Sequence, residues 1–190
     1  MFGMMQQEQY KVAMEAAVYM VEVDDLLFPK RDYLLQVYYL FANFVEFTEG
    51  RTLAKPLVDF MKLCYEEQGE EAVLPKTLKH FGLPDSYLEN FERLRANAHL
   101  PLKLFLPDKT KHFLKALFAS KKQVGILTDG NPVEQLNKLK HIDWEELSPF
   151  LSLLKIFFLK ELAFRNLEPL DFLQETYAVD KADICIVKQL

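Results

Sequence analysis

The sequence predicts an α/β protein: a three-layer, Rossmann-like core with a parallel sheet of about four strands, and an inserted all-helical region. Three observations lead to this fold class. Short apolar runs occur at residues 17–23, 123–128, 153–159 and 184–187. Helical patterns separate the last three runs, and this alternation is typical of a parallel sheet. Residues 30–98 show helical periodicity and no strand signal.

The first apolar run, AVYMVEV, reads as a buried strand and is followed by acidic residues. Asp32 is expected to cap a helix, and SYLE (Ser86–Glu89) has the form of a capping box that opens a later helix. Apolar and aromatic side chains follow Asp32 at helical spacing: Tyr33, Leu34, Val37, Tyr38, Phe41, Phe44 and Val45. We therefore expect two domains, an α/β core of residues 1–29 plus 99–190 and a helical cap of residues 30–98.

The second half alternates between helices and strands. Asp108 is expected to cap a helix over 109–120, which leads into the strand QVGILT at 123–128. Asn131-Pro132-Val133-Glu134 is a helix start, with an Asn cap and proline at the first helical position. Pro169 opens another helix before the strand at 184–187.

Ligands of parallel sheets bind at the carboxyl ends of the strands. Glu22–Asp25 follow the first strand, and Thr128–Asn131 follow the second. Lys188–Leu190 follow the last strand. We therefore expect these three segments and the region after Leu159, which follows the third strand, to meet at one site. A simpler interpretation is that Asp24 and Asp25 only cap the turn that leaves the first strand.

Composition excludes several classes of protein. The chain has 190 residues and a net charge of −5, which argues against a nucleic-acid partner because phosphate backbones attract basic surfaces. No apolar run reaches the roughly 18 residues of a membrane span, and the N-terminus lacks the order of a signal peptide. Cys64 and Cys185 lie in apolar runs and are expected to be reduced, as in a cytoplasmic protein.

Two stretches, DDLLFPKRDYLLQVYYLF and GILTDGNPVEQLNKLK, resemble the haloacid dehalogenase-like superfamily of hydrolases, most of which are phosphatases. The resemblance covers nearly the whole chain and is to members with a helical cap. It implies an aspartate nucleophile, an aspartate acid/base two residues later, a Ser/Thr hydroxyl, a lysine, and an acidic motif that holds Mg²⁺.

On this sequence, the resemblance places the nucleophile at Glu22 and the lysine at Asn166, beside Arg165. The acidic motif falls on Val187-Lys188-Gln189. The resulting site residues are Glu22, Asp24 and Thr128 as catalytic positions, Thr128, Asp129, Gly130, Asn131 and Arg165 as phosphate-binding positions, and Glu22 and Asp24 as metal ligands.

Three positions depart from the family pattern. Glu22 carries its carboxylate about 1.5 Å further out than aspartate would, one carbon–carbon bond. A misplacement of roughly 1 Å can cost on the order of 100-fold in rate. Asn166 lacks the lysine charge, and Gln189 is neutral where the family has an acid. We therefore expect lost or very weak phosphohydrolase activity and no or weak magnesium binding.

Other functions stay open at this point. The helix start after Thr128 is a generic anion site and could bind a small phosphorylated metabolite without hydrolysing it. An active magnesium-dependent phosphatase of a small metabolite is a second hypothesis. An interaction or scaffolding protein, with homodimer formation, is a third, because the helix over 33–47 is rich in aromatic residues and a four-stranded sheet leaves an edge to be covered.

Overall fold

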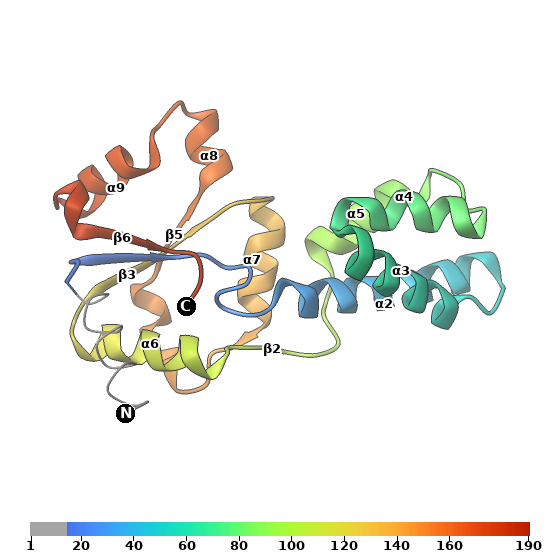
Figure 1. The fold of residues 1–190 in the computed structure, drawn as a ribbon, viewed down its shortest axis with the longest axis horizontal. Helices are drawn as coiled ribbons and strands as arrows, with labels where there is room; N and C mark the ends of the chain where they lie inside the picture. Colours follow the sequence, from blue (N-terminus) through green and yellow to red (C-terminus); the bar gives the residue numbers. More distant parts are fainter. Residues whose placement is uncertain (1–14) are drawn as a thin grey trace. The chain divides into compact units, whose positions relative to one another are not determined.

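The computed structural model describes residues 15–190 and confirms the predicted fold class. Its main sheet has four parallel strands in the order β5–β3–β1–β6 (Figure 1). The strands are β1 (Val18–Val21), β3 (Gln123–Thr128), β5 (Lys155–Phe158) and β6 (Ile184–Val187), each inside one of the four predicted apolar runs. β2 (Leu104–Phe105) and β4 (Ile142–Asp143) form a second, two-stranded parallel sheet.

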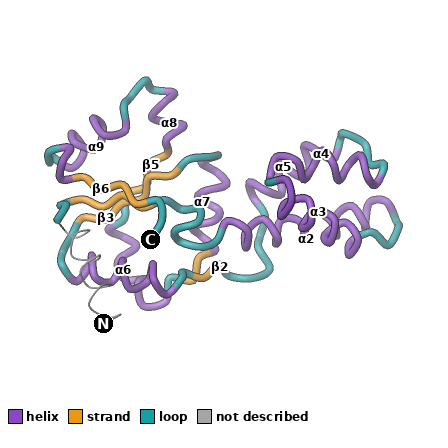
Figure 2. Tube along the Cα trace, viewed as in Figure 1, coloured by secondary structure: helices purple, strands orange, loops and turns teal. Residues whose placement is uncertain are grey.

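The chain divides into two compact units, Met1–Pro29 with Leu104–Leu190, and Lys30–Lys103. The first unit contains α6 (Asp108–Ala119), α7 (Pro132–His141), α8 (Leu159–Phe164) and α9 (Pro169–Tyr177), together with the 3₁₀ helices η1 (Glu145–Leu153) and η2 (Lys181–Asp183). The second contains only helices: α2 (Lys30–Glu49), α3 (Ala54–Gln68), α4 (Glu70–Phe81) and α5 (Tyr87–Asn97) (Figure 2). That each unit is an independent domain stays a prediction.

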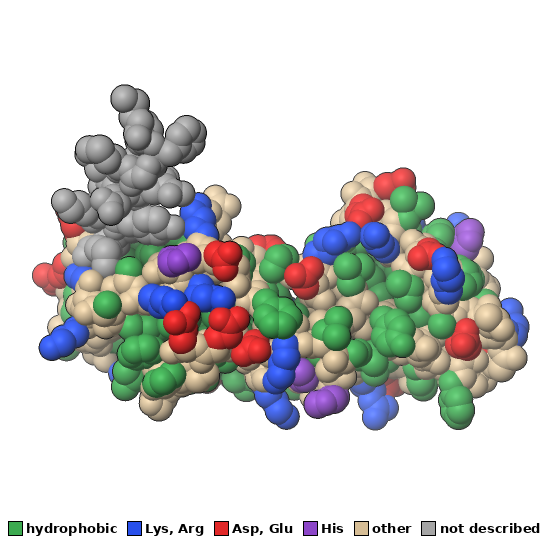
Figure 3. Space-filling model, turned by 90° about the horizontal axis from the view of Figure 1, so that it is seen from below, with side chains coloured by type: hydrophobic (Ala, Val, Ile, Leu, Met, Phe, Trp, Pro, Cys, Tyr) green, Lys and Arg blue, Asp and Glu red, His purple; other side chains and the backbone are tan. Residues whose placement is uncertain are grey.

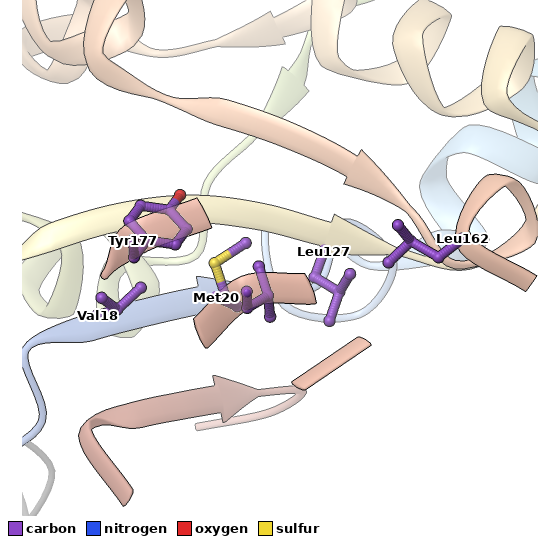
Figure 4. Close-up of a cluster of buried hydrophobic side chains, with 6 residues drawn as sticks. Val18, Met20, Leu127, Leu162 and Tyr177 are labelled. Carbon is purple, nitrogen blue, oxygen red and sulfur yellow. The ribbon is translucent and has the colours of Figure 1, made fainter. Parts of the chain in front are cut away.

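Helices cover both faces of the main sheet. Side chains alternate between the faces along each strand, so Val18 and Met20 of β1 point to one side and Tyr19 to the other. A cluster of buried side chains on the first side joins the sheet to α8 and α9: Val18, Met20, Leu127, Leu162, Leu173 and Tyr177 (Figure 4). On the second side, the Tyr19 ring lies edge-on to Phe113 of α6, at 6.1 Å between centroids.

The helical unit has an aromatic core along α2. Phe41 is fully buried and lies edge-on to Phe91 of α5, at 5.2 Å between ring centroids. Tyr38 is 1% exposed and stacks on the same Phe91 ring. The helical spacing of aromatic residues seen in the sequence is therefore mostly a core stripe.

The structure corrects three predicted helix caps. Asp32 lies inside the first turn of α2, which begins at Lys30, and α6 begins at Asp108 itself. Ser86 precedes α5 but makes no capping hydrogen bond with its side chain. Asn131 does cap α7, because its Oδ1 accepts a hydrogen bond from the Val133 N–H at 2.9 Å. The two acids, Asp32 and Asp108, still lie in a first turn, where a negative charge favours a helix.

Acidic and basic side chains are interspersed on the face of the molecule seen in Figure 3. Ion pairs join α6 to η1: Lys111 with Glu145 at 2.8 Å, and Lys115 with Glu146. Lysines of α6 are therefore partly neutralised by a neighbouring helix. No helix within residues 15–190 combines the length and the apolar character that crossing a membrane requires.

Candidate functional site

The ends of β1 and β3 meet through a direct side-chain contact. Val21 pairs with Ile126 in the parallel register, so the next residues of both strands emerge at the same edge. The hydroxyl of Thr128, which is fully buried, donates a hydrogen bond to Oε1 of Glu22. The same oxygen accepts the N–H of Val23 at 2.8 Å. Glu22 therefore turns back onto the strand ends.

The end of β6 lies beside the same point. The backbone N–H of Glu22 donates to the carbonyl of Val187 at 3.0 Å. Lys188 and Gln189 follow directly, and both are exposed. Three of the four segments expected from the sequence to converge therefore follow the neighbouring strands β3, β1 and β6. The fourth, after Leu159, follows β5, which pairs with β3 at the edge of the sheet.

Asp24 and Asp25 lie in a tight turn after β1. The N–H of Asp25 donates to the carbonyl of Phe28 at 2.9 Å, and the N–H of Leu27 donates to the carbonyl of Val23 at 3.1 Å. Asp25 has a φ of 63°, the left-handed region that aspartate tolerates better than most residues. The turn accounts for Asp25, while the Asp24 side chain has a separate set of contacts.

Asp24 is held by a buried ammonium group from α7. Nζ of Lys138 lies 2.9 Å from Oδ1 and 3.0 Å from Oδ2 of Asp24, and 2.8 Å from Oε1 of Glu134. The Lys138 side chain is 0% exposed, and the Asp24 side chain is 19% exposed. Gln135 donates from Nε2 to Oδ2 of Asp24 at 3.2 Å. A single cation thus bridges two acids.

Sequence reasoning missed Lys138 and Gln135. Glu134 and Lys138 are four residues apart, and such pairs usually lie on the solvent-exposed face of a helix. The sequence pattern gave no signal for this burial, because the buried side of α7 carries Gln135 and Lys138 beside Leu139. The apolar side chains of Val133 and Leu136 are 50% and 48% exposed instead.

In the loop between β3 and α7, the Gly130 N–H is bonded within the loop, and the Asp129 carbonyl is bonded by a side chain of α7. The N–H of Gly130 donates to Oδ1 of Asp129 at 2.7 Å, and the carbonyl of Asp129 accepts from Nε2 of Gln135 at 2.8 Å. Gly130 has a φ of 100°, and a Cβ added there would lie 2.9 Å from Gln135 Nε2. The loop that the resemblance assigns to phosphate therefore uses these donors internally.

Arg165 and Asn166 lie in an exposed turn between α8 and α9. The Arg165 guanidinium is 5.9 Å from the centre of the Phe172 ring, and Asn166 has a φ of 55°. Among the described residues, neither side chain makes a hydrogen bond or ion pair with Glu22, Asp24 or Thr128. The positive charge nearest to the acids at the strand ends comes from Lys138.

The residues present do not fit the magnesium ion that the resemblance implies. Mg²⁺ needs one or two carboxylates with free oxygens, plus water. Both oxygens of Asp24 face the Lys138 ammonium, and Oε1 of Glu22 already accepts two hydrogen bonds. Within residues 15–190, no three His, Cys, Asp or Glu side chains are grouped as a metal site. A second cation at Asp24 would also be repelled by the buried ammonium.

No family model and no curated protein sequence matches the chain. Solved structures do show similarity. A dehalogenase in an intermediate complex gives a TM-score of 0.46 at 14% identity, covering 92% of this chain and 76% of its own. A haloacid dehalogenase-like hydrolase from Burkholderia xenovorans gives 0.40 at 15% identity, covering 86% and 71%. A hydrolase from Streptococcus pneumoniae gives 0.46 at 9% identity, covering 92% of both chains. Similarity at this level assigns neither a family nor a chemistry to this chain.

Proposed function

We propose that this chain is a haloacid dehalogenase-like protein without metal-dependent phosphohydrolase activity, in which the motif residues bind one another. The observation that carries the proposal is the hydrogen bond from Thr128 to Glu22. In the family that the motifs resemble, this hydroxyl binds the phosphate. Here its acceptor is a carboxylate of the same protein, at the position of the nucleophile.

The Glu22 carboxylate competes with any incoming anion. It takes the Thr128 hydroxyl and the Val23 N–H, two donors that a phosphoryl group at the strand ends would use. Because Glu22 is tethered to the same turn, its effective concentration is far above that of a dissolved ligand. A phosphate ester would have to displace this carboxylate, and two anions at one place repel each other.

The contacts of Asp24 also weigh against acid/base catalysis. A general acid or base must reach the group that gains or loses a proton. Both oxygens of Asp24 are within 3.0 Å of the Lys138 ammonium. Proton transfer by Asp24 would require that this buried ion pair first break, which is costly where water cannot replace the lost partner.

The purified protein is expected not to hydrolyse p-nitrophenyl phosphate or sugar phosphates, with or without Mg²⁺. Release of p-nitrophenol and of inorganic phosphate measures this directly. Triple replacement of Glu22→Asp, Asn166→Lys and Gln189→Asp tests whether the family chemistry can be restored. Magnesium-dependent turnover by the wild type that Asp24→Asn abolishes would overturn the proposal and favour an active phosphatase.

Removing the Glu22 carboxylate is expected to create an anion site. Calorimetric titration with inorganic phosphate should show no saturable binding to the wild type. Glu22→Ala should bind phosphate with a dissociation constant of about 1 mM, an affinity that a few charge-assisted hydrogen bonds can supply. Adding Thr128→Val should remove this binding again.

Glu145→Ala is the matched control for the phosphate titration. It also removes an acid, but Glu145 is exposed and pairs with Lys111, not with a residue at the strand ends. It should leave the wild-type result unchanged. Saturable phosphate binding to the wild type, with no gain in Glu22→Ala, would instead support a protein that binds a phosphorylated metabolite.

A second candidate function, an interaction protein that self-associates, has one observation in its favour. Tyr39 and Phe47 of α2 are 52% and 87% exposed, although the neighbouring aromatic residues of this helix are buried. With exposed Asn43 they lie four residues apart along one side of the helix. Sedimentation velocity over a range of concentrations should show association that Phe47→Ser weakens. Identical monomeric behaviour of both proteins would count against this candidate.

A further inference from the structure

The helical unit contains a groove whose wall is formed mainly by α5. Its volume is about 430 Å³, and its lining residues are Phe44, Asn90, Arg93, Leu94, Asn97 and Ala98. A volume of this size lies within the range of roughly 300–1,000 Å³ seen in small-molecule sites. All the lining residues belong to the helical unit, so the groove does not depend on the strand ends described above.

The spacing along α5 places the polar groups in one row. Asn90, Arg93 and Asn97 are three and four residues apart, and therefore follow one side of the helix. The side next to it packs into the core through Tyr87 and Phe91. Asn90 and Asn97 are separated by two turns, or about 10 Å. The row is thus as long as a molecule of moderate size.

Arg93 differs from the other arginines of the helical unit. Arg31 pairs with Glu66, Arg51 with Glu49, and Arg95 with Glu70. Within residues 15–190, the Arg93 side chain makes neither an ion pair nor a hydrogen bond, and the same is true of the Asn90 and Asn97 amides. A guanidinium between two amides therefore lines the groove with its donors available.

The rest of the groove lining is apolar. Phe44 from α2 lines the groove together with Leu94 of α5 and Ala98, the residue that follows α5. The Phe44 ring is held in place by Tyr87, which lies edge-on at 6.0 Å between centroids. An aromatic ring fixed in this way offers an apolar contact at low entropic cost.

We propose that this groove binds a small organic carboxylate with an apolar body. The carboxylate pairs with the Arg93 guanidinium, whose planar donors match two carboxylate oxygens. The Asn90 and Asn97 amides bind polar groups on either side. The apolar body lies against Phe44 and Leu94. The chemistry requires one negative charge and an apolar part about as large as a phenyl ring.

The test uses 3-phenylpropionate as the probe and 3-phenylpropan-1-ol as its uncharged counterpart, titrated into the full chain. Backbone amide shifts in ¹H–¹⁵N spectra report binding, and residues 44, 90–94 and 97 should shift. The carboxylate should bind at least about tenfold more tightly than the alcohol, as expected for a charge-assisted hydrogen bond. Arg93→Gln should weaken carboxylate binding by about the same factor and leave alcohol binding unchanged.

Arg51→Gln is the matched control, because it removes the same charge from an exposed site elsewhere in the helical unit. It should leave both affinities unchanged, and thermal unfolding of each variant should match the wild type. Three results would overturn the proposal: no saturable shifts at the lined residues, equal affinity for acid and alcohol, or equal weakening by Arg51→Gln. The phosphohydrolase assays do not bear on this groove, so the two proposals fail separately.

Discussion

Replacing Lys138 with methionine is expected to lower the free energy of unfolding by about 3–5 kcal/mol, the range observed when one partner of a buried ion pair is removed. Methionine fills a similar volume, so the loss comes from the charge. Without the ammonium, the carboxylates of Asp24 and Glu134 face each other with no cation between them. Glu134 is 5% exposed, so water screens this repulsion poorly. Urea unfolding followed by circular dichroism measures the change.

Lys55→Met is the comparison for Lys138→Met. Lys55 pairs with Asp59 at 2.7 Å one turn along α3, but its side chain is 86% exposed. This change should leave the free energy of unfolding close to the wild-type value, because exposed ion pairs contribute little to stability. Adding Asp24→Asn and Glu134→Gln to Lys138→Met removes the repulsion and should restore most of the loss. A cost below about 1 kcal/mol for Lys138→Met would contradict the buried bridge described above.

Gly125→Ala is expected to destabilise the protein by about 1–3 kcal/mol, the usual cost of overpacking a core. An added Cβ would lie 2.6 Å from the Tyr177 hydroxyl and 2.8 Å from Met20 Cε. The methionine end can rotate away. The tyrosine ring is held in the cluster between the sheet and α9, and has no such freedom (Figure 4). Thermal and urea unfolding would both detect the change.

Tyr177→Phe is expected to rescue Gly125→Ala. It removes the hydroxyl that meets the new methyl group, and so should reduce the cost of Gly125→Ala to below about 1 kcal/mol. By itself, Tyr177→Phe should be neutral or stabilising, because this buried hydroxyl has no hydrogen-bond partner among residues 15–190. Burial also raises the pKa of Tyr177, so the hydroxyl stays neutral in these assays. Equal costs of Gly125→Ala in both backgrounds would show that the hydroxyl is not the obstacle.

The fold class could be predicted because four apolar runs and their separating helices are strong local signals. β2 and β4 could not be predicted, since two residues are too short for any periodic pattern. α4 was predicted only as part of the helical region 30–98, and Pro75 lies inside it. The cap predicted at Asp108 was misplaced by one residue, and the cap predicted at Asp32 by three, because α2 begins at Lys30.

The site was predictable only in outline. Strand order in a parallel sheet brings Glu22 and Thr128 to one edge, and their positions follow from the motifs. No sequence rule predicts that the Glu22 carboxylate accepts a hydrogen bond from the Thr128 hydroxyl. The burial of Lys138 depends on tertiary packing of α7, which a pattern of exposed-looking charges conceals.

The position of β1 at the middle of the sheet has a consequence for how the chain folds. Its partners β3 and β6 are synthesised after the entire helical insertion. The second edge of β1 therefore cannot pair until β6, in which Ile184 is the partner of Val18, has been synthesised. The helical unit is continuous in sequence and can acquire its core while the ribosome is still adding residues. The sheet must then close across very distant segments, and this loop closure carries an entropic cost that the helical unit does not bear.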